Sequence, residues 1–419
     1  MTFDLHEFDG KNVVFVGAGK GRAAEGVEAF LKAHATIQSF TSVSRRPGDE
    51  PYGFVRDYDP ATTVFIKNEG VPGTAVPVPY TTPMQLFFRL AHANGLTAVG
   101  ITGTKGKSTT TALTAAILKH AGKPVVLAGN IGTSPLPALA EATPDTIFVL
   151  ELSSYQLSDM TISPRVSACI NLYNDHMDWH GSLENYWEAK RNIMRFAGPD
   201  DVFIYNPGFP ALQEWADTAN CKTIAINPFE QLDLSEAKLY GEHNVLNALV
   251  AREIARQFGV DDAVSLDAIN TFEPLRHRMQ TVAVKNGRTY IDDAIGMTPE
   301  STTASLRAVT EKVGPVGCLL LGGQDRGYDF TEVMKVIAGL NIPHLVMFPE
   351  TEAKMKAAMP DGYQPAIFET QSMTDAVAYA NEHAPEGSVV LLSTAAPSYV
   401  LWKDFEDKGD RFQDAVNAL

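Results

Sequence analysis

Short apolar runs alternate with longer amphipathic segments along nearly the whole chain. Such short runs predict buried strands, and segments with apolar residues every three or four positions predict helices. The clearest strand-like runs are Asn12–Val16, Thr97–Ile101, Thr146–Leu150, Val166–Leu172, Val202–Tyr205, Cys318–Leu321, Leu345–Phe348 and Val389–Leu392. Strands that alternate with helices are typical of parallel sheets covered on both faces, so the sequence predicts an α/β fold.

Two changes in this pattern divide the chain of 419 residues. A predicted helix that begins at Pro83 ends before Asn94–Gly95, and a new strand follows. Near Arg278–Thr281 a helical region gives way to two short strands around the turn Asn286–Gly287. Because domains usually have about 100–200 residues, we predict three of them, at residues 1–94, 95–279 and 280–419.

Charge and hydropathy exclude several classes of partner. The net charge of -16 argues against nucleic acid, because neutralising phosphates needs a basic surface. The most apolar runs, Gly317–Gly322 and Ser388–Leu392, are far shorter than the ~20 residues that cross a bilayer. Met1–Gly10 carries acidic residues where a secretory signal would be basic. We therefore expect a cytoplasmic protein that binds small molecules and contacts neither nucleic acid nor membrane.

A glycine-rich turn follows the first predicted strand. Gly17 and Gly19 lie between that strand and a helix, which suits a diphosphate bound at the helix N-terminus, although such a turn can also simply pack a helix on a sheet. The third glycine of the dinucleotide fingerprint is missing, and Ser39–Ser42 offers no acid for a ribose. A uridine diphosphate group therefore fits better than NAD. A second loop, Lys67–Gly73, includes Asn68 and could close over the same ligand.

The strongest signal is the segment Gly100–Thr110, in which a strand breaks into a glycine-rich loop and then a helix. Backbone N–H groups of such a loop hold phosphate oxygens, a lysine faces the β- and γ-phosphates, and a hydroxyl binds Mg²⁺. The spacing differs from the strict eight-residue P-loop. The predicted nucleotide-binding residues here are Gly103, Thr104, Lys105, Gly106, Lys107, Ser108 and Thr109.

Two further strands end in polar side chains. Glu151 follows the apolar run Thr146–Leu150, where a magnesium ligand is expected beside a phosphate loop. The run Val166–Leu172 leads into a polar segment that contains His176 and His180. Zinc is the rival interpretation, but no cysteine accompanies the histidines and their spacing does not match a helical zinc motif. We therefore assign Glu151 and His176 to a magnesium and substrate site.

Together these motifs resemble the muramyl ligases, and the loop itself also resembles that of folylpolyglutamate synthases. The segments in the family's order are Gly129–Gly132, Glu151–Leu157, Asn174–Asp178, Tyr186–Lys190, Gly241–Ala248 and Arg276–Gln280. The similarity covers essentially the whole chain and is strongest in residues 95–279. It implies a P-loop-type central ATPase domain with a mostly parallel sheet, between Rossmann-like N- and C-terminal domains.

The resemblance also implies roles for single residues. Lys107, Ser108 and Thr109 would hold the phosphates of ATP and one of two Mg²⁺ ions, with Glu151 as a shared ligand and His176 on the second ion. The other implied contacts are Asn130 at the muramoyl substrate, Asn244 and Asn247 at the adenine, and Arg278 at the nucleotide.

Lys190 matches a lysine that the family carries as a carbamate, which would make it an anionic magnesium ligand. Without the resemblance, Lys190 would be interpreted as a surface lysine on a helix.

Two C-terminal segments resemble the amino-acid site of the family. They place Arg326 and Ser398 at the carboxylates of glutamate and Phe405 beside its chain. Read from the residues alone, Arg326 caps a turn and Phe405 fills a core.

The stretch Asp292–Thr298 departs from the usual pattern N-D-S-K-A-T-N. It keeps the nucleotide-side acid at Asp293 but has Ile295 for the lysine and Met297 for the threonine. The departure resembles a minor branch that accepts L-glutamate, which leaves the stereochemistry open.

The resemblance finally implies an activity: a monomer that uses ATP to join glutamate to UDP-N-acetylmuramoyl-L-alanine. Two alternatives stay open. One is a related ligase for L-glutamate or another amino acid, and the other is a regulatory protein that hydrolyses ATP without ligation.

Overall fold

The computed structural model describes residues 1–17, 22–44, 52–234 and 236–419. Its α/β chain forms two compact units, which we describe separately. Unit 1 contains Met1–Ser235 and Val245–Phe272, and unit 2 contains Glu236–Asn244 and Glu273–Leu419. Unit 1 has two parallel sheets and unit 2 has one mixed sheet. The predicted α/β fold is confirmed, while the three domain boundaries stay predictions.

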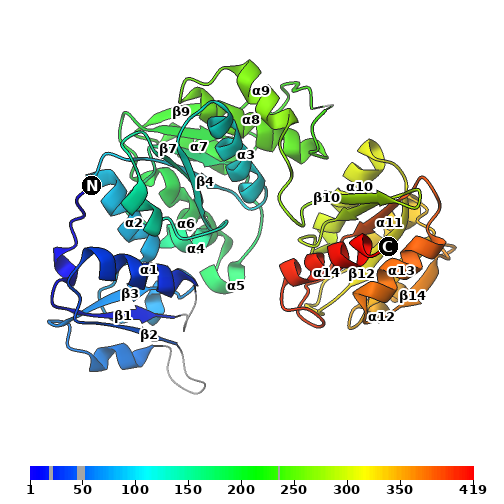
Figure 1. Cartoon of the computed structure of the whole chain (residues 1–419), viewed down its shortest axis with the longest axis horizontal. Helices are drawn as coiled ribbons and strands as arrows, with labels where there is room; N and C mark the ends of the chain where they lie inside the picture. Colours follow the sequence, from blue (N-terminus) through cyan, green and yellow to red (C-terminus); the bar gives the residue numbers. More distant parts are fainter. Residues whose placement is uncertain (18–21, 45–51, 235) are drawn as a thin grey trace. The chain divides into compact units, whose positions relative to one another are not determined.

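The first sheet of unit 1 has three parallel strands in the order β2-β1-β3, drawn in blue in Figure 1. The bounds are β1 Asn12–Val16, β2 Ser39–Val43, β3 Thr63–Lys67, α1 Arg22–His34 and α2 Pro83–Ala93. Successive side chains of a strand point to opposite faces. Phe15 accordingly packs with Val27 and Leu31 of α1, whereas Val14 packs with Phe65 on the other face.

The second sheet of unit 1 has six parallel strands in the order β5-β6-β4-β7-β8-β9. Its strands are β4 Thr97–Thr102, β5 Val125–Gly129, β6 Ile147–Glu151, β7 Val166–Cys169, β8 Val202–Tyr205 and β9 Lys222–Ala225. Its helices are α3 Lys107–His120, α4 Ser154–Ser158, α5 Met177–His180, α6 Leu183–Arg195, α7 Pro210–Asp217, α8 Glu242–Arg256 and α9 Asp262–Asn270. All six strands run in one direction, so their C-terminal ends meet at one edge.

The predicted strand Val166–Leu172 is shorter than its apolar run, because β7 ends at Cys169. The chain leaves the sheet there and turns towards the loop after β4. The N–H of Ile170 donates to the carbonyl of Thr102 at 3.0 Å, and the N–H of Thr104 donates to the carbonyl of Asn171 at 3.1 Å. The last apolar residues of the run therefore support the phosphate loop rather than a strand.

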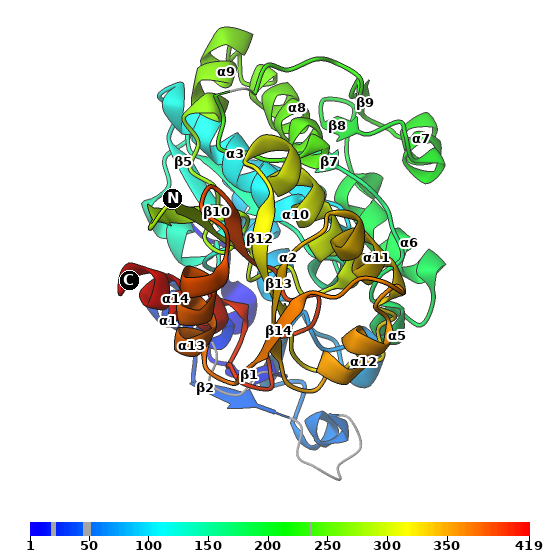
Figure 2. The ribbon, with the colours of Figure 1, turned by 90° about the vertical axis from the view of Figure 1, so that its right-hand side faces the viewer.

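The sheet of unit 2 has the order β10-β11-β15-β12-β13-β14, with β10 antiparallel to β11 and the other pairs parallel. Its strands are β10 Gln280–Lys285, β11 Arg288–Asp292, β12 Val316–Gly322, β13 His344–Phe348, β14 Ala366–Glu369 and β15 Val389–Leu392. Its helices are α10 Pro299–Lys312, α11 Thr331–Gly339, α12 Glu352–Ala357, α13 Met373–His383 and α14 Phe405–Asn417, and Figure 2 shows them around the sheet.

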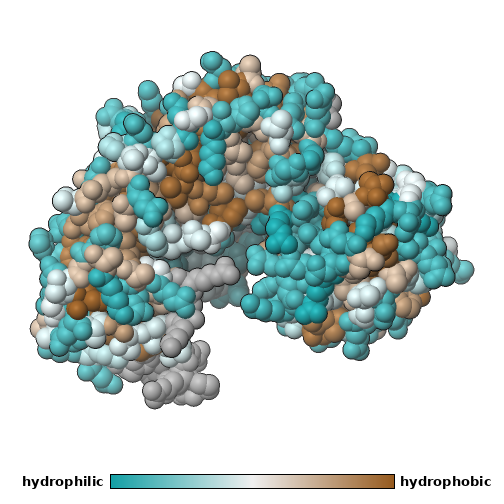
Figure 3. Space-filling view, in the orientation of Figure 1, coloured by the Kyte–Doolittle hydropathy of each residue, from teal (hydrophilic) through white to brown (hydrophobic). Residues whose placement is uncertain are grey.

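Both faces of this sheet are covered, as the pattern predicted. Leu319 and Leu321 of β12 belong to the core formed with α10 and α11, whereas Cys318 and Leu320 belong to the core formed with α13 and α14. The face of the molecule drawn in Figure 3 is mostly hydrophilic, with small apolar patches. Among the described residues, no helix is long and apolar enough to cross a membrane.

Candidate active site

The predicted phosphate loop lies between β4 and α3, at the C-terminal edge of the six-stranded sheet. Gly106 precedes the helix with φ +81, a left-handed conformation that favours glycine. A Cβ atom at Gly106 would also lie 2.4 Å from Oδ1 of Asn247. Ser108 and Thr109 stand in the first turn of α3, whose N–H groups are suited to phosphate oxygens. Lys105 is exposed at the tip of the loop.

Asn171 holds this loop in place, and the sequence analysis did not select it. Its Oδ1 accepts hydrogen bonds from the N–H groups of Thr104 and Lys105, both at 2.9 Å. Its Nδ2 donates to the carbonyl of Lys105 at 3.1 Å. An amide so close to the end of an apolar run, next to the strand that carries the loop, was the signal that could have identified it.

Glu151 ends β6 beside the loop and is only 2% exposed. Its Oε1 accepts a hydrogen bond from Nδ2 of Asn130 at 2.9 Å, which places Asn130 at the same edge. Its Oε2 is buried and has no hydrogen-bond partner. An unpaired buried carboxylate oxygen is costly, and a cation at this position would satisfy it. The residues present therefore fit a bound metal ion.

Lys190 lies on α6 and is 1% exposed, so it is not the surface lysine that the residues alone suggested. Its Nζ donates to the carbonyl of Gly103 at 2.9 Å and lies 4.7 Å from the ring centroid of Tyr186. Burial, and next the charge of Lys107, lower the pKa of Lys190 to about 7. Lys107 itself donates to the carbonyl of Thr104 at 2.9 Å.

His176 precedes α5 in a left-handed conformation, with φ 49. The hydroxyl of Tyr155 and Nδ1 of His176 are hydrogen-bonded at 2.9 Å. This leaves Nε2 of the ring for a ligand when the imidazole is neutral. Burial lowers the pKa of His176, which favours the neutral ring.

These side chains surround one small cavity of about 100 Å³. Its lining residues are Lys107, Asn130, Ser153, Ser154, Tyr155, His176, Tyr186 and Lys190. The structure thus brings together most of the predicted catalytic residues of unit 1. Among the described residues, no three His, Cys, Asp or Glu side chains form a group that could hold a metal. A magnesium site here would need the hydroxyl of Ser108 and an oxygen at Lys190 as well.

A larger cavity of about 750 Å³ lies in unit 1 next to the small one. Gly129 and Gln156 line the large cavity, whereas their neighbours Asn130 and Tyr155 line the small one. Residues of α1 and Glu141 form other parts of its wall. Its size and its position beside the phosphate loop suit an extended substrate whose reacting end enters the small cavity.

The predicted diphosphate residues are only partly described. Gly17 follows β1 with φ +117, and a Cβ atom there would lie 2.1 Å from Cγ2 of Val71 in the second loop. Gly19 lies outside the described residues. The Oδ1 of Asn68 accepts a hydrogen bond from the N–H of Gly70 at 2.9 Å, so this side chain closes the turn of its own loop.

The predicted adenine residues belong to different units. Asn247 is 2% exposed in unit 1, and its Oδ1 accepts a hydrogen bond from the hydroxyl of Thr110 at 3.1 Å. Asn244 belongs to unit 2, where its Nδ2 donates to the carbonyl of Tyr240 at 2.7 Å. Both amides are thus hydrogen-bonded within their own units, near the start of α8.

Asp293 is buried in unit 2, where its Oδ2 accepts hydrogen bonds from the hydroxyls of Ser305 at 2.6 Å and Ser393 at 2.9 Å. Burial raises the pKa of Asp293 to about 6. In this structure the carboxylate of Asp293 is therefore hydrogen-bonded inside unit 2.

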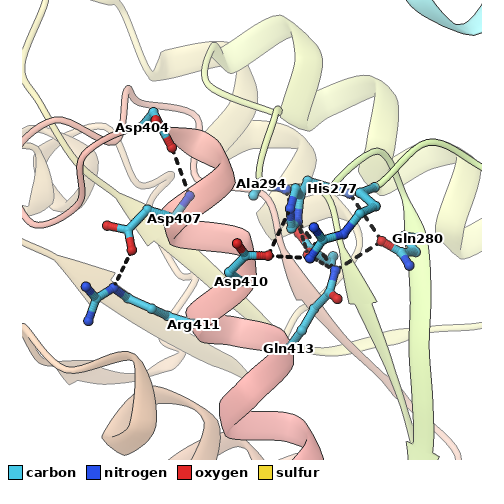
Figure 4. A network of polar contacts seen from close by, with 10 residues as sticks. His277, Gln280, Ala294, Asp404, Asp407, Asp410, Arg411 and Gln413 are labelled. Atoms are coloured by element: carbon cyan, nitrogen blue, oxygen red, sulfur yellow. Dashed lines mark hydrogen bonds and ion pairs between the residues drawn. The ribbon is translucent and has the colours of Figure 1, made fainter. Parts of the chain in front are cut away.

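Arg278 lies in the segment that leads into β10, next to a buried histidine. Figure 4 shows His277 between α14 and Gln280. Its Nδ1 lies 2.7 Å from Oδ2 of Asp292, and Nε2 of Gln413 donates to the same carboxylate oxygen at 2.8 Å. Arg278 is half-buried beside this network, at the start of unit 2. The network thus fixes the backbone that presents Arg278.

The predicted amino-acid residues also lie in unit 2. Arg326 is exposed, with its Nε donating to Oε1 of Gln324 at 3.1 Å and its guanidinium carbon 5.6 Å from the ring centroid of Tyr399. Ser398 is 1% exposed and directs its hydroxyl at the sulfur of Met297, at 3.8 Å. Phe405 begins α14, partly buried. Arg326 therefore has the exposed position of a ligand-binding side chain.

Comparisons with known proteins agree with this arrangement. Residues 101–233 match the Mur ligase middle domain, and residues 277–396 match the Mur ligase glutamate ligase domain. A UDP-N-acetylmuramoylalanine–D-glutamate ligase of Ligilactobacillus salivarius is 31% identical, over 99% of this chain and 98% of its own length. The enzyme of the same name from Bacillus cereus is also 31% identical, over 85% of this chain and 84% of its own.

Solved structures show the same fold. The UDP-N-acetylmuramate-alanine ligase of Thermotoga maritima has a TM-score of 0.64 at 19% identity and covers 97% of this chain and 99% of its own. The MurF ligase of Thermotoga maritima, solved in complex with ADP, has a TM-score of 0.64 at 16% identity and covers 98% of this chain and 96% of its own. On these matches, the chain belongs to the Mur ligase family.

Proposed function

We propose that this protein is an ATP-dependent amide ligase that joins D-glutamate to UDP-N-acetylmuramoyl-L-alanine in the synthesis of peptidoglycan precursors. The observation that carries the proposal is the meeting of Lys107, His176 and Lys190 around one cavity at the C-terminal edge of a parallel sheet. Glu151 joins them through its hydrogen bond with Asn130, which also lines this cavity. The names of the curated relatives support this choice of substrates.

The reaction has two steps. An oxygen of the alanyl carboxylate attacks the γ-phosphorus of ATP, and the bond to the bridging oxygen breaks as ADP leaves. The amine of glutamate then attacks the carbonyl carbon of the acyl phosphate. The resulting tetrahedral intermediate loses a proton from nitrogen and expels phosphate, which leaves the amide. No protein nucleophile is needed, so the side chains act by positioning and by stabilising charge.

Within this reaction, Lys107 and the N–H groups of the phosphate loop stabilise charge on the transferring phosphoryl group. Asn171 keeps that loop in its binding shape through three hydrogen bonds. The neighbouring large cavity holds the UDP-linked substrate with its alanyl end directed at the small one. Water is kept from the acyl phosphate by the aromatic side chains of the small cavity, Tyr155 and Tyr186.

Two Mg²⁺ ions would be held by Ser108, Glu151, His176 and Lys190. Bound Mg²⁺ neutralises the negative charge that builds up on the phosphoryl oxygens. The unpaired Oε2 of Glu151 supports the site. Mg²⁺ prefers oxygen ligands, so Nε2 of His176 is the least usual ligand of the set. The metal site therefore needs a second carboxylate-like oxygen besides Glu151.

Carbamylation of Lys190 supplies that oxygen. The neutral amine attacks carbon dioxide, a C–N bond forms, and one proton is released, which leaves an anionic carbamate. The position of Lys190 supports this step, because its Nζ is buried between Gly103 and Tyr186 at the wall of the small cavity. Its low pKa also provides neutral amine near pH 7.

The choice of D-glutamate rests on the relatives, and Met297 favours the alternative. The hydroxyl of Ser398 points at the Met297 sulfur, a weak acceptor. This residue stands where the family usually has a threonine, so the glutamate pocket is altered at this point. L-glutamate, or another amino acid, is therefore the second candidate substrate. We place the enzyme in the cytoplasm, where ATP is available, as a monomer.

A substrate matrix tests the proposal. ADP formation is measured with UDP-N-acetylmuramoyl-L-alanine and, in turn, D-glutamate, L-glutamate and other amino acids. We expect turnover with D-glutamate and near silence with ATP alone. Steady ATP hydrolysis without either co-substrate would instead favour the non-ligating regulatory protein. Exclusive use of L-glutamate would overturn the choice of isomer while keeping the ligase.

A further inference from the structure

Glu69 is a carboxyl group in the wall of the large cavity of unit 1. Its Oε1 accepts a hydrogen bond from the N–H of Met84 at 3.2 Å, in the first turn of α2. An ionised carboxyl group has about four lone-pair sites, so this bond leaves capacity for a ligand. Its neighbour Asn68, which the sequence pointed to, uses its own side chain to close the turn at Gly70.

The loop that carries Glu69 is braced on both sides. Before it, the buried Nζ of Lys67 donates to the carbonyl of Val71 at 2.6 Å and pairs with Oδ2 of Asp159 at 2.9 Å. After it, the carbonyl of Gly70 accepts a hydrogen bond from Nε1 of Trp179 at 3.0 Å. Asp159 directly follows α4, and Trp179 lies in α5, both in the six-stranded half of unit 1. The carboxyl of Glu69 is therefore held in a fixed position.

A path of contacts connects the loop of Glu69 with the small cavity. The ring of Trp179, which binds Gly70, packs edge-on against Tyr155 with ring centroids 4.8 Å apart. Tyr155 lines the small cavity with Lys107 and Lys190. From this path of contacts we infer that Glu69 faces the part of the substrate that precedes the reacting carboxylate, rather than the far, uridine end.

The charge of the cavity wall restricts what Glu69 can meet. Glu25, Glu69 and Glu141 line the cavity, and its described lining contains no lysine or arginine. Carboxyl groups at these three positions can accept hydrogen bonds from neutral hydroxyl and amide groups.

We propose that Glu69 is a further substrate-binding residue, whose carboxyl accepts a hydrogen bond from an O–H or N–H group of the muramoyl part of the substrate. This inference rests on the proposed function, since it assigns the large cavity to that UDP-linked substrate. It makes Glu69 a determinant of specificity for the amino-sugar portion, separate from the residues that bind the diphosphate.

Binding measurements without turnover test this assignment. The Kd values of UDP-N-acetylmuramoyl-L-alanine, UDP-N-acetylmuramic acid and UDP are measured by calorimetry, without ATP, for the wild type, Glu69→Gln and Glu69→Ala. We expect Glu69→Ala to weaken both muramoyl ligands about tenfold or more, because a hydrogen bond to a charged group contributes roughly 1.5–3 kcal/mol. Binding of UDP should change by less than about twofold. Glu69→Gln keeps one acceptor oxygen, so its Kd values for the muramoyl ligands should fall between those of the wild type and of Glu69→Ala.

A matched control separates local binding from general effects. Glu28→Ala removes the same charge from α1, at a residue that pairs with Lys32 and does not line the cavity. It should leave all three Kd values unchanged. If Glu69 only stabilises the start of α2, Glu69→Ala lowers the melting temperature without separating the ligands. The inference is overturned by such a loss of stability without discrimination between ligands. It is also overturned if UDP binding weakens equally, or if the wild type does not bind the muramoyl ligands. Wild-type ADP formation tests the ligase function independently.

Discussion

Two buried lysines, one in each unit, have similar local properties and very different surroundings. Lys190 in unit 1 is 1% exposed and Lys408 in unit 2 is 0% exposed, and burial lowers the pKa of each to about 7. Lys190 lies at the wall of a cavity with Lys107 and His176. Lys408 lies inside unit 2, where its Nζ donates to the hydroxyl of Thr394 at 2.6 Å.

The charged groups around the two lysines also differ. After burial, the next influence on Lys190 is the positive charge of Lys107, which lowers its pKa further. The next influences on Lys408 are the acids Asp292 and Asp293, which raise its pKa. Unit 1 therefore places its lysine beside a cation of the predicted phosphate loop, whereas unit 2 places its lysine near groups of opposite charge.

This contrast shows that a perturbed pKa alone does not identify a functional lysine. Access to a cavity and an unsatisfied neighbour are the additional criteria. Lys190 meets both, because it lines the small cavity and the nearby Glu151 has an unpaired oxygen. Lys408 lines neither of the two cavities described above, and we assign it to the stability of unit 2.

The largest effect is expected in the phosphate loop. Lys107→Ala should lower kcat by roughly 10²–10³, because it removes one charge aimed at the transferring phosphoryl group. The side chain is half-buried and lines a cavity, so circular dichroism should show an intact fold. ADP formation at saturating substrates measures the loss. Near-normal turnover by the folded variant would show that the loop does not bind the phosphates.

The next effect contrasts the two lysines directly. Lys190→Ala should lower kcat by on the order of a hundredfold, in the range of losses at metal sites. Acetate should restore part of the activity by providing a carboxylate in the vacated space. Lys408→Ala serves as the matched control, with a smaller change in turnover per folded molecule and no rescue. Equal responses of both variants to acetate would remove the distinction between the two sites.

A smaller effect is expected at the exposed cation of unit 2. Arg326→Ala should raise the KM for glutamate about tenfold, because a charge-assisted hydrogen bond to a carboxylate contributes roughly 1.5–3 kcal/mol. The KM for ATP should move little. Steady-state kinetics with D- and L-glutamate measures both values. An unchanged KM for glutamate would exclude Arg326 from the amino-acid site.

Much of the fold and part of the site were predictable from sequence. The apolar runs identified the central strands, because a strand buried on both faces is apolar throughout. They missed β5 and the largely exposed edge strands β9 and β14. The phosphate loop and Glu151 were predictable because both come directly after such runs, and the strand ends meet at one edge. Only the family resemblance predicted that Lys190 and the residues of unit 2 belong to the site.

The rest depended on contacts between distant segments. Asn171 reads as one polar residue near a strand end, and only the structure shows it bonded to Thr104 and Lys105. Lys408 reads as a surface lysine in a charged helix, yet it is fully buried. Glu69 was passed over in favour of Asn68, because sequence cannot tell which side chain of a loop faces a cavity and which closes its turn.

The smallest predicted effect tests the assignment of Lys408 to stability. Its pKa is about 7 in the folded protein and near the ordinary 10.5 in the unfolded chain. Between these values the unfolded chain binds one more proton, so the free energy of unfolding should rise with pH, at up to about 1.4 kcal/mol per pH unit from this group. Lys408→Met removes that contribution and should flatten the pH dependence of the urea midpoint between pH 7 and 10. The exposed Lys403→Met is the control and should retain the wild-type slope. If Lys408→Met also retained the wild-type slope, Lys408 would titrate normally in the folded protein, and the similarity between the two buried lysines would be lost.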